Sequence, residues 1–103
     1  MAELTIVYWR DIPAQVMAGR GRQAVRVALP ERFEQAIDRA AMQAGATGSD
    51  AYLEDWRRAS VTRPGDDAGA AARAEAARLD ADYDTARLRA LIDNHGHARR
   101  PEP

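Results

Sequence analysis

The segment LTIVYWR, residues 4–10, constrains the fold more than any other part of this chain. Its β-branched and aromatic residues predict a strand. Successive side chains of a strand point to opposite faces, so a strand with one exposed face should alternate apolar and polar residues. Here Leu4, Ile6 and Tyr8 share one face, whereas Val7 and Trp9 lie on the other. The fold must cover both faces or leave an apolar surface for a partner.

Two further strands are predicted after this segment. Residues 11–13 (Asp-Ile-Pro) end the first strand, because proline lacks an N–H and favours extended geometry before it. A short strand near residues 14–18 leads to the turn 19–22 (Gly-Arg-Gly-Arg), where glycine can adopt positive φ. The stretch 23–29 alternates apolar and other residues, as a returning strand does. We therefore expect a three-stranded antiparallel meander.

Helices are predicted for most of the remaining chain. The first begins at Pro30-Glu31 and ends at Gly45, and its apolar residues recur at helical spacing. A second begins near Ser49, a favourable N-cap residue. Residues 60–67 (SVTRPGDD) are expected to form a loop or a brief extended piece, and an alanine-rich helix is expected to follow over residues 67–93.

These elements predict a single α+β domain over residues 1–93, with a disordered polar tail over residues 94–103 that adds nothing to stability. The expected architecture is a three-stranded antiparallel meander with two helices packed on one face and a long C-terminal helix. One sheet face then stays open unless the third helix folds back over it.

The composition excludes several classes of function. The chain has no cysteine, which rules out disulfides, thiol catalysis and iron–sulfur ligation by its own residues. Its net charge of −1 gives no general attraction to nucleic acid or to anionic membranes. His95 and His97 fall in the expected tail, where nothing holds a metal ligand set together. We expect a cytoplasmic protein that is not an enzyme and binds no metal or cofactor.

The open face and the end of the first strand form the main candidate interface. Tryptophan beside arginine is the composition of interaction hot spots. In the alternative interpretation, Trp9 lies in the core while Arg10 and Asp11 hold the following turn. The candidate interface residues are Val7, Trp9, Arg10, Asp11, Met17 and Arg26.

The turn between the second and third strands is a weaker candidate, for binding an anion. Its residues are Gly19, Arg20, Gly21 and Arg22. Glycine N–H groups and two arginines can bind phosphate, although the pattern lacks the lysine and the Ser/Thr of a P-loop.

Three stretches carry a resemblance to a known family: LTIVYWRDIPAQV, LPERFEQAIDRAAM and SDAYLEDWRR. Over roughly residues 3–60 they resemble small bacterial proteins labelled "virulence factor". A related domain occurs in the conserved virulence factor C proteins, beside an iron–sulfur-scaffold-like domain and helical repeats. The family label implies no catalytic residues. Stand-alone members are encoded near folate- and corrinoid-dependent methyl-transfer enzymes, which implies a role in one-carbon metabolism.

We therefore expect a non-catalytic accessory or adaptor subunit that binds another protein within a cytoplasmic enzyme system. The sequence does not identify the partner, and a second copy of the chain is one alternative. The alternative function is binding of a small anion or a cofactor phosphate at the Gly-Arg turn.

Overall fold

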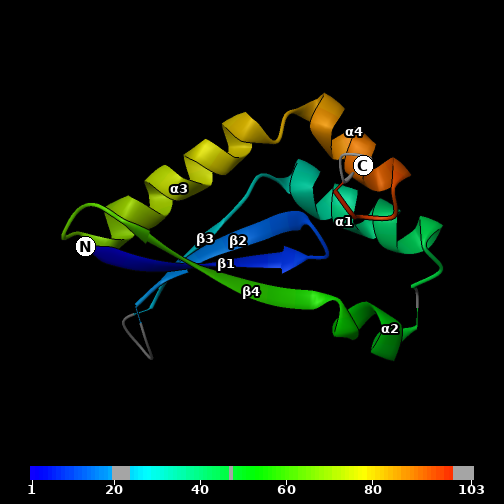
Figure 1. The fold of residues 1–103 in the computed structure, drawn as a ribbon, viewed down its shortest axis with the longest axis horizontal. Coiled ribbons are helices and arrows are strands. Elements are labelled where there is room, and N and C mark those ends of the chain that lie inside the picture. Colours follow the sequence, from blue (N-terminus) through cyan, green and yellow to red (C-terminus); the bar gives the residue numbers. More distant parts are fainter. Residues whose placement is uncertain (20–23, 47, 99–103) are drawn as a thin grey trace, which may run out of the picture.

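The computed structural model describes residues 1–19, 24–46 and 48–98, which form an α+β fold (Figure 1). The antiparallel sheet has four strands in the order β3-β2-β1-β4: β1 (Ala2–Trp9), β2 (Ile12–Ala18), β3 (Val25–Ala28) and β4 (Trp56–Arg63). The helices are α1 (Glu31–Gln43), α2 (Ser49–Glu54), α3 (Ala68–Asp82) and α4 (Thr85–Asp93). Within these described ranges, no helix has both the length and the apolar character needed to cross a membrane.

The fourth strand corrects the predicted three-stranded sheet. Helix α2 ends at Glu54, and β4 then pairs with β1 along its whole length, from Ala2 opposite Arg63 to Trp9 opposite Trp56. The region expected to be the end of a helix followed by a loop or a brief extended piece is therefore a strand of eight residues. Pairing with β4 satisfies the backbone groups along the outer side of β1, and this tertiary gain outweighs local helix propensity.

The C-terminal helix predicted over residues 67–93 is also wrong as a single element, because the structure has two helices there, α3 and α4. The chain leaves helical geometry at Tyr83, whose φ and ψ are −99° and 71°. Asp84 then caps α4 by accepting a hydrogen bond of 2.8 Å from the Arg87 backbone N–H. This N-cap starts a new helix in a new direction, which allows α4 to pack along α1 while α3 lies on the sheet.

The two faces of the sheet differ in what covers them. Helix α3 lies over β1, β2 and β3 and buries Leu4, Ile6 and Val16, whereas α1 contacts β2 and packs against α4. On the opposite face, Val7 and Met17 are only half-buried. The even-numbered face of β1 is thus the helix-covered face, and the third predicted helix covers that face rather than the open one.

Trp9 is in the core, contrary to the prediction that places it in an exposed interface. It is 0 % exposed, its Nε1 donates a hydrogen bond of 2.9 Å to the Tyr52 carbonyl, and its ring stacks on the Tyr52 ring at a centroid distance of 5.9 Å. Gly96 lies against the same indole. Helix α2 and the C-terminal segment, residues 94–98, therefore cover the apolar face at this end of β1.

The first residues of the predicted disordered tail are held in place. Gly96 is buried, its φ is +91°, and its carbonyl accepts a hydrogen bond of 2.9 Å from the Asp11 N–H. Residues 94–98 therefore belong to the folded domain, because they cover Trp9. The remaining residues of that predicted tail, 99–103, lie outside the described residues.

We expect Gly96→Ala to lower the free energy of unfolding by about 2–4 kcal/mol. A Cβ at this position would lie 2.8 Å from the Trp9 ring, and its φ of +91° is unfavourable for any residue with a Cβ. Urea unfolding followed by Trp fluorescence measures the change.

Gly69→Ala in α3 is the matched control. A Cβ there would approach the Arg73 and Asp67 side chains no closer than 3.4 Å. Because alanine favours helix over glycine, this control should leave stability unchanged or raise it by up to about 1 kcal/mol. Equal stability of Gly96→Ala and the parent protein would show that Gly96 does not pack tightly on Trp9.

Candidate functional site

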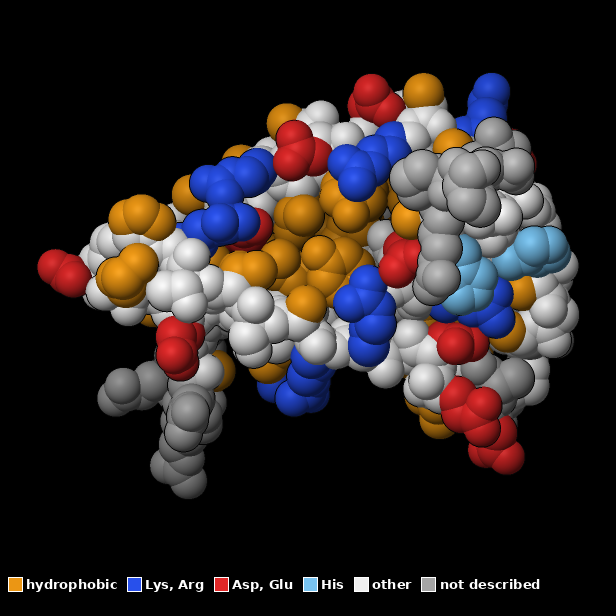
Figure 2. Space-filling model, in the orientation of Figure 1, with side chains coloured by type: hydrophobic (Ala, Val, Ile, Leu, Met, Phe, Trp, Pro, Cys, Tyr) orange, Lys and Arg blue, Asp and Glu red, His pale blue; other side chains and the backbone are white. Residues whose placement is uncertain are grey.

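Apolar side chains gather between α3 and β4, with arginines around them (Figure 2). Helix α3 covers the neighbouring strands but leaves the residues of β4 half-buried on this side. We call this region, together with Arg58 on the opposite face of the same strand, the β4 surface. It comprises Tyr8, Arg57, Arg58, Ala59, Val61, Arg63, Tyr83 and Arg87.

Two tyrosines of the β4 surface each lie beneath an arginine. The Arg57 guanidinium carbon is 4.3 Å from the centre of the Tyr8 ring, and that of Arg87 is 3.8 Å from the centre of the Tyr83 ring. Burial raises the pKa of the Tyr8 hydroxyl, with a further contribution from Tyr83, and Arg57 only partly opposes this. Tyr8 is therefore neutral at physiological pH and presents an aromatic face beside a cation.

At the Arg63 end of the β4 surface, the buried carboxylate of Glu75 links β4 to α3. Glu75 is 2 % exposed, and Arg63 donates two hydrogen bonds to it, of 2.7 and 3.1 Å. Arg78 adds a third, of 3.1 Å. Hydrogen bonding from Arg63 lowers the pKa of the Glu75 carboxyl more than burial raises it, so this pKa lies below its ordinary value. Two cations on one carboxylate leave net positive charge here.

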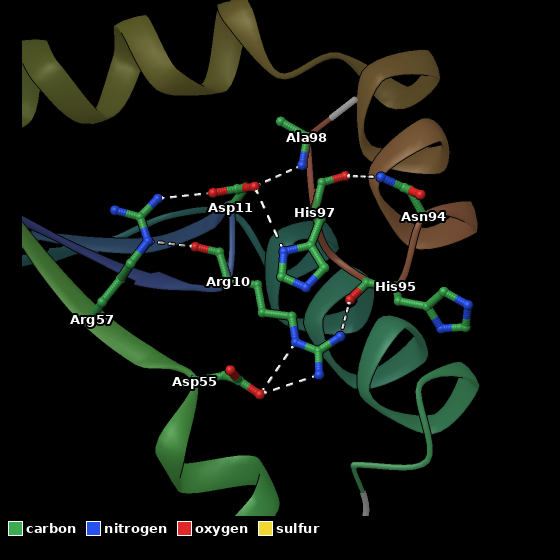
Figure 3. A network of polar contacts seen from close by, with 8 residues as sticks. All are labelled: Arg10, Asp11, Asp55, Arg57, Asn94, His95, His97 and Ala98. Atoms are coloured by element: carbon green, nitrogen blue, oxygen red, sulfur yellow. Dashed lines mark hydrogen bonds and ion pairs between the residues drawn. The ribbon is translucent and has the colours of Figure 1, made fainter. Parts of the chain in front are cut away.

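The turn after β1 is held by a polar network around Arg10 (Figure 3). Arg10 has a φ of +53°, and its backbone N–H donates a hydrogen bond of 3.0 Å to the Asp55 carbonyl. Its guanidinium lies 3.2 Å from the Asp55 carboxylate, donates to the His95 carbonyl at 2.6 Å and stacks over the Trp9 ring at 4.8 Å. The turn, the start of β4 and the C-terminal segment are thereby joined.

Asp11 joins the same network from the next position (Figure 3). Its carboxylate accepts hydrogen bonds from Arg57 at 3.0 Å and from the Ala98 N–H at 2.6 Å, and His97 Nδ1 lies 4.0 Å away. Burial raises the pKa of this carboxyl, but the hydrogen bonds from Ala98 and Arg57 outweigh it, so the pKa lies below its ordinary value. Arg10 and Asp11 thus hold the turn, as the structural interpretation of the sequence proposes.

The other predicted interface residues do lie on a common face. Val7, Met17 and Arg26 belong to three adjacent strands and occupy the sheet face opposite α3. Val7 lines a hollow of about 310 Å³ together with α1 and α2 residues, among them Ile37 and Tyr52. The predicted interface residues therefore do not form one surface. Trp9 is buried, Arg10 and Asp11 hold the turn, and the other three lie on this face.

The remaining features are weaker candidates for a functional site. Gly19 follows β2 and has a φ of +82°, but Arg20, Gly21 and Arg22 of the predicted anion site lie outside the described residues. Among the described ranges, no three His, Asp or Glu side chains come together as a metal site. A groove of about 320 Å³ between α1 and α4 carries arginines, yet its Arg32 already binds the Asp80 carboxylate at 2.6 Å.

Sequence reasoning missed the β4 surface because it missed β4. The signal lies in WRRASVTR, where Ala59 and Val61 alternate with Arg58, Ser60 and Thr62. Arginine at both ends of this stretch hides the two-residue period, and the preceding Tyr52 and Leu53 continue a helical pattern. Nothing in the local sequence indicates that Tyr83 and Arg87 lie near these residues.

A family model matches most of this chain. The model of a family described as "Virulence factor" matches residues 7–92, which include β4 and every residue of the β4 surface. Searches of curated proteins and of solved structures found no match.

We expect Glu75→Gln to lower the free energy of unfolding at pH 7 by about 1–3 kcal/mol, because charged hydrogen bonds from Arg63 and Arg78 are weakened. Since the folded-state pKa of Glu75 is lowered, its contribution is present above the ordinary value of about 4.5 and is lost as pH falls through the folded-state pKa. Denaturant unfolding between pH 3 and pH 7 measures both effects.

The exposed Glu54→Gln is the control and should change stability by less than about 0.5 kcal/mol. A Glu75→Gln variant whose stability depends on pH as steeply as that of the parent protein would contradict a role for the ionised carboxylate.

Proposed function

We propose that this protein, whose chain belongs to the virulence factor family, is a non-catalytic accessory subunit that binds another protein through the β4 surface. On the family resemblance, the proposed setting is a cytoplasmic enzyme system of folate- or corrinoid-dependent one-carbon metabolism. The observation that carries the proposal is the pair of arginine-covered tyrosines flanking a half-buried apolar stripe on β4.

The β4 surface has the composition and the rigidity that protein recognition requires. Tyrosine and arginine dominate binding hot spots because each offers a large contact area together with polar groups at its tip. Arg57 is fixed by Asp11 and by the Arg10 carbonyl, and Arg63 is fixed by Glu75. Side chains that are already ordered lose little entropy on binding, which favours affinity.

The alternative function, binding of a small anion at the Gly-Arg turn, stays a prediction. Three of its four residues lie outside the described ranges. The proposal for the β4 surface therefore rests on placed side chains, whereas the alternative rests on the sequence pattern alone.

We expect a tagged parent protein to copurify with a specific partner from its native host, and an Arg58→Glu/Arg87→Glu variant to lose that partner. Both arginines are exposed, so the double substitution reverses charge at the β4 surface without removing core contacts. Copurified proteins are quantified by mass spectrometry, and circular dichroism checks the fold of each variant.

Arg39→Glu/Arg89→Glu is the matched control, because it makes the same charge change on exposed residues of α1 and α4. This control should retain the partner. If both variants retain it, or both lose it, the β4 surface is not the binding site. If the parent protein copurifies with no partner, the accessory-subunit function itself is contradicted.

A further inference from the structure

The outer side of β4 is a sheet edge. In the strand order β3-β2-β1-β4, β4 pairs with β1 on one side, and no other strand of the described chain pairs with its outer side. The edge is eight residues long, from Trp56 to Arg63, whereas the opposite edge strand, β3, has four residues. An unpaired edge presents backbone donors and acceptors to a further strand.

The register shows which backbone groups face outward. The Arg10 N–H donates to the Asp55 carbonyl, in line with the β1–β4 register. In an antiparallel ladder, residues whose backbone groups face the partner alternate with residues whose groups face away. Counting from Asp55, the backbone N–H and C=O groups of Arg58, Ser60 and Thr62 therefore point away from β1, toward the free edge.

The side chains on the two faces beside this edge determine which charge on an added strand would be favourable. Arg57 and Arg63 flank the apolar stripe of the β4 surface, and Arg58 lies on the opposite face. Strand β4 has no acidic residue, and Arg78 and Arg87 add positive charge from α3 and α4. A strand seated here would lie beside Arg57 and Arg63 on one face and beside Arg58 on the other.

We infer that the free edge of β4 binds an extended, acidic segment of a partner protein by strand addition, with main-chain hydrogen bonds to Arg58, Ser60 and Thr62. This inference rests on the proposed function, since it specifies how the partner is bound. Backbone pairing supplies affinity in such complexes, and the alternate side chains supply specificity. Acidic residues of the partner would face the arginines, while its apolar residues would meet the stripe formed by Ala59 and Val61.

Charge argues against a second copy of this chain as the occupant. Pairing β4 with the β4 of another molecule brings together three arginines from each copy and no carboxylate from either strand. Like charges at a strand interface are destabilising. An acidic strand faces the same arginines with attraction, and that attraction weakens with salt.

The test uses the full chain and a fluorescein-labelled ten-residue peptide of alternating Glu and Val residues. We expect saturable binding by fluorescence anisotropy that weakens with added salt, and NMR shifts that centre on the amides of residues 58–62. A peptide with Lys in place of Glu should not bind. A Glu/Val peptide with proline at two central positions should bind at least about tenfold more weakly, because it lacks the required N–H groups.

Ser60→Pro is the decisive variant. Proline is tolerated on an edge strand where the N–H that it removes faces away from the neighbouring strand. We expect this variant to remain folded by circular dichroism and to bind the Glu/Val peptide at least about tenfold more weakly, whereas Ser60→Ala should bind as the parent does. If Ser60→Pro unfolds, Ser60 N-methylated by chemical synthesis replaces it.

Several results would overturn the inference. If the proline-containing peptide binds as tightly as the Glu/Val peptide, the protein attracts polyanions without strand addition. The same follows if the Ser60→Pro or N-methylated protein binds the Glu/Val peptide as tightly as the parent protein does. No binding of the Glu/Val peptide at 1 mM would exclude the acidic strand as occupant. A parent dimer that Ser60→Pro converts to monomer in sedimentation would assign the edge to a second copy. Retention of the copurified partner by Ser60→Pro would refute strand addition while leaving the proposed function intact.

Discussion

The packing of Gly96 against Trp9 is the contact on which the organisation of this domain depends. The indole stands at the end of β1 with no exposed surface, between Tyr52 of α2 and the backbone of the C-terminal segment. Only a residue without a Cβ fits against the ring at this distance. The chain must therefore return from the end of α4 to the first strand before the core is closed.

That closure also explains where β4 lies. Helix α2 is anchored when the Tyr52 carbonyl accepts the Trp9 indole N–H, and it ends two residues later. Arg10 then binds Asp55, and the next residues pair with β1 from its Trp9 end. The arginines of β4 reach the sheet edge because this short helix is held against the tryptophan. The structural network and the candidate binding surface thus share Arg57, which contacts Asp11 from within the strand.

The proposed binding surface consists of side chains that have structural partners as well. Arg63 binds Glu75, and the two tyrosine rings each support an arginine, so the cations stay ordered without a ligand. Such an arrangement protects an exposed edge from pairing with itself, since it places like charges along the strand. It also leaves the same edge attractive to a strand of opposite charge. The charge pattern that protects the edge is therefore the same one on which the proposed recognition depends.

The sequence by itself determined the local elements whose signals are short in range. The first strand, the turn after it and the helix that begins at Glu31 follow from residue type and period, although Pro13 itself lies in β2 and not in the turn, and the family was recognised from the same stretches. The two-sided apolar character of residues 4–9 left open whether the second face is covered or meets a partner, and in the structure Val7 stays half-buried, whereas Trp9 is fully buried. What covers it depended on Gly96, which is 87 residues away from Trp9 and carries no local signal of that contact.

Only the tertiary structure decided the fourth strand, the break at Asp84 and the candidate site. The stretch from Trp56 to Arg63 becomes a strand because β1 offers it unpaired backbone groups, which is a property of another part of the chain. Trp9 is core rather than interface because Tyr52 and Gly96 enclose it, and its own neighbours in sequence do not distinguish these fates. Local patterns specify which face of an element is apolar, whereas long-range packing decides which apolar faces are covered.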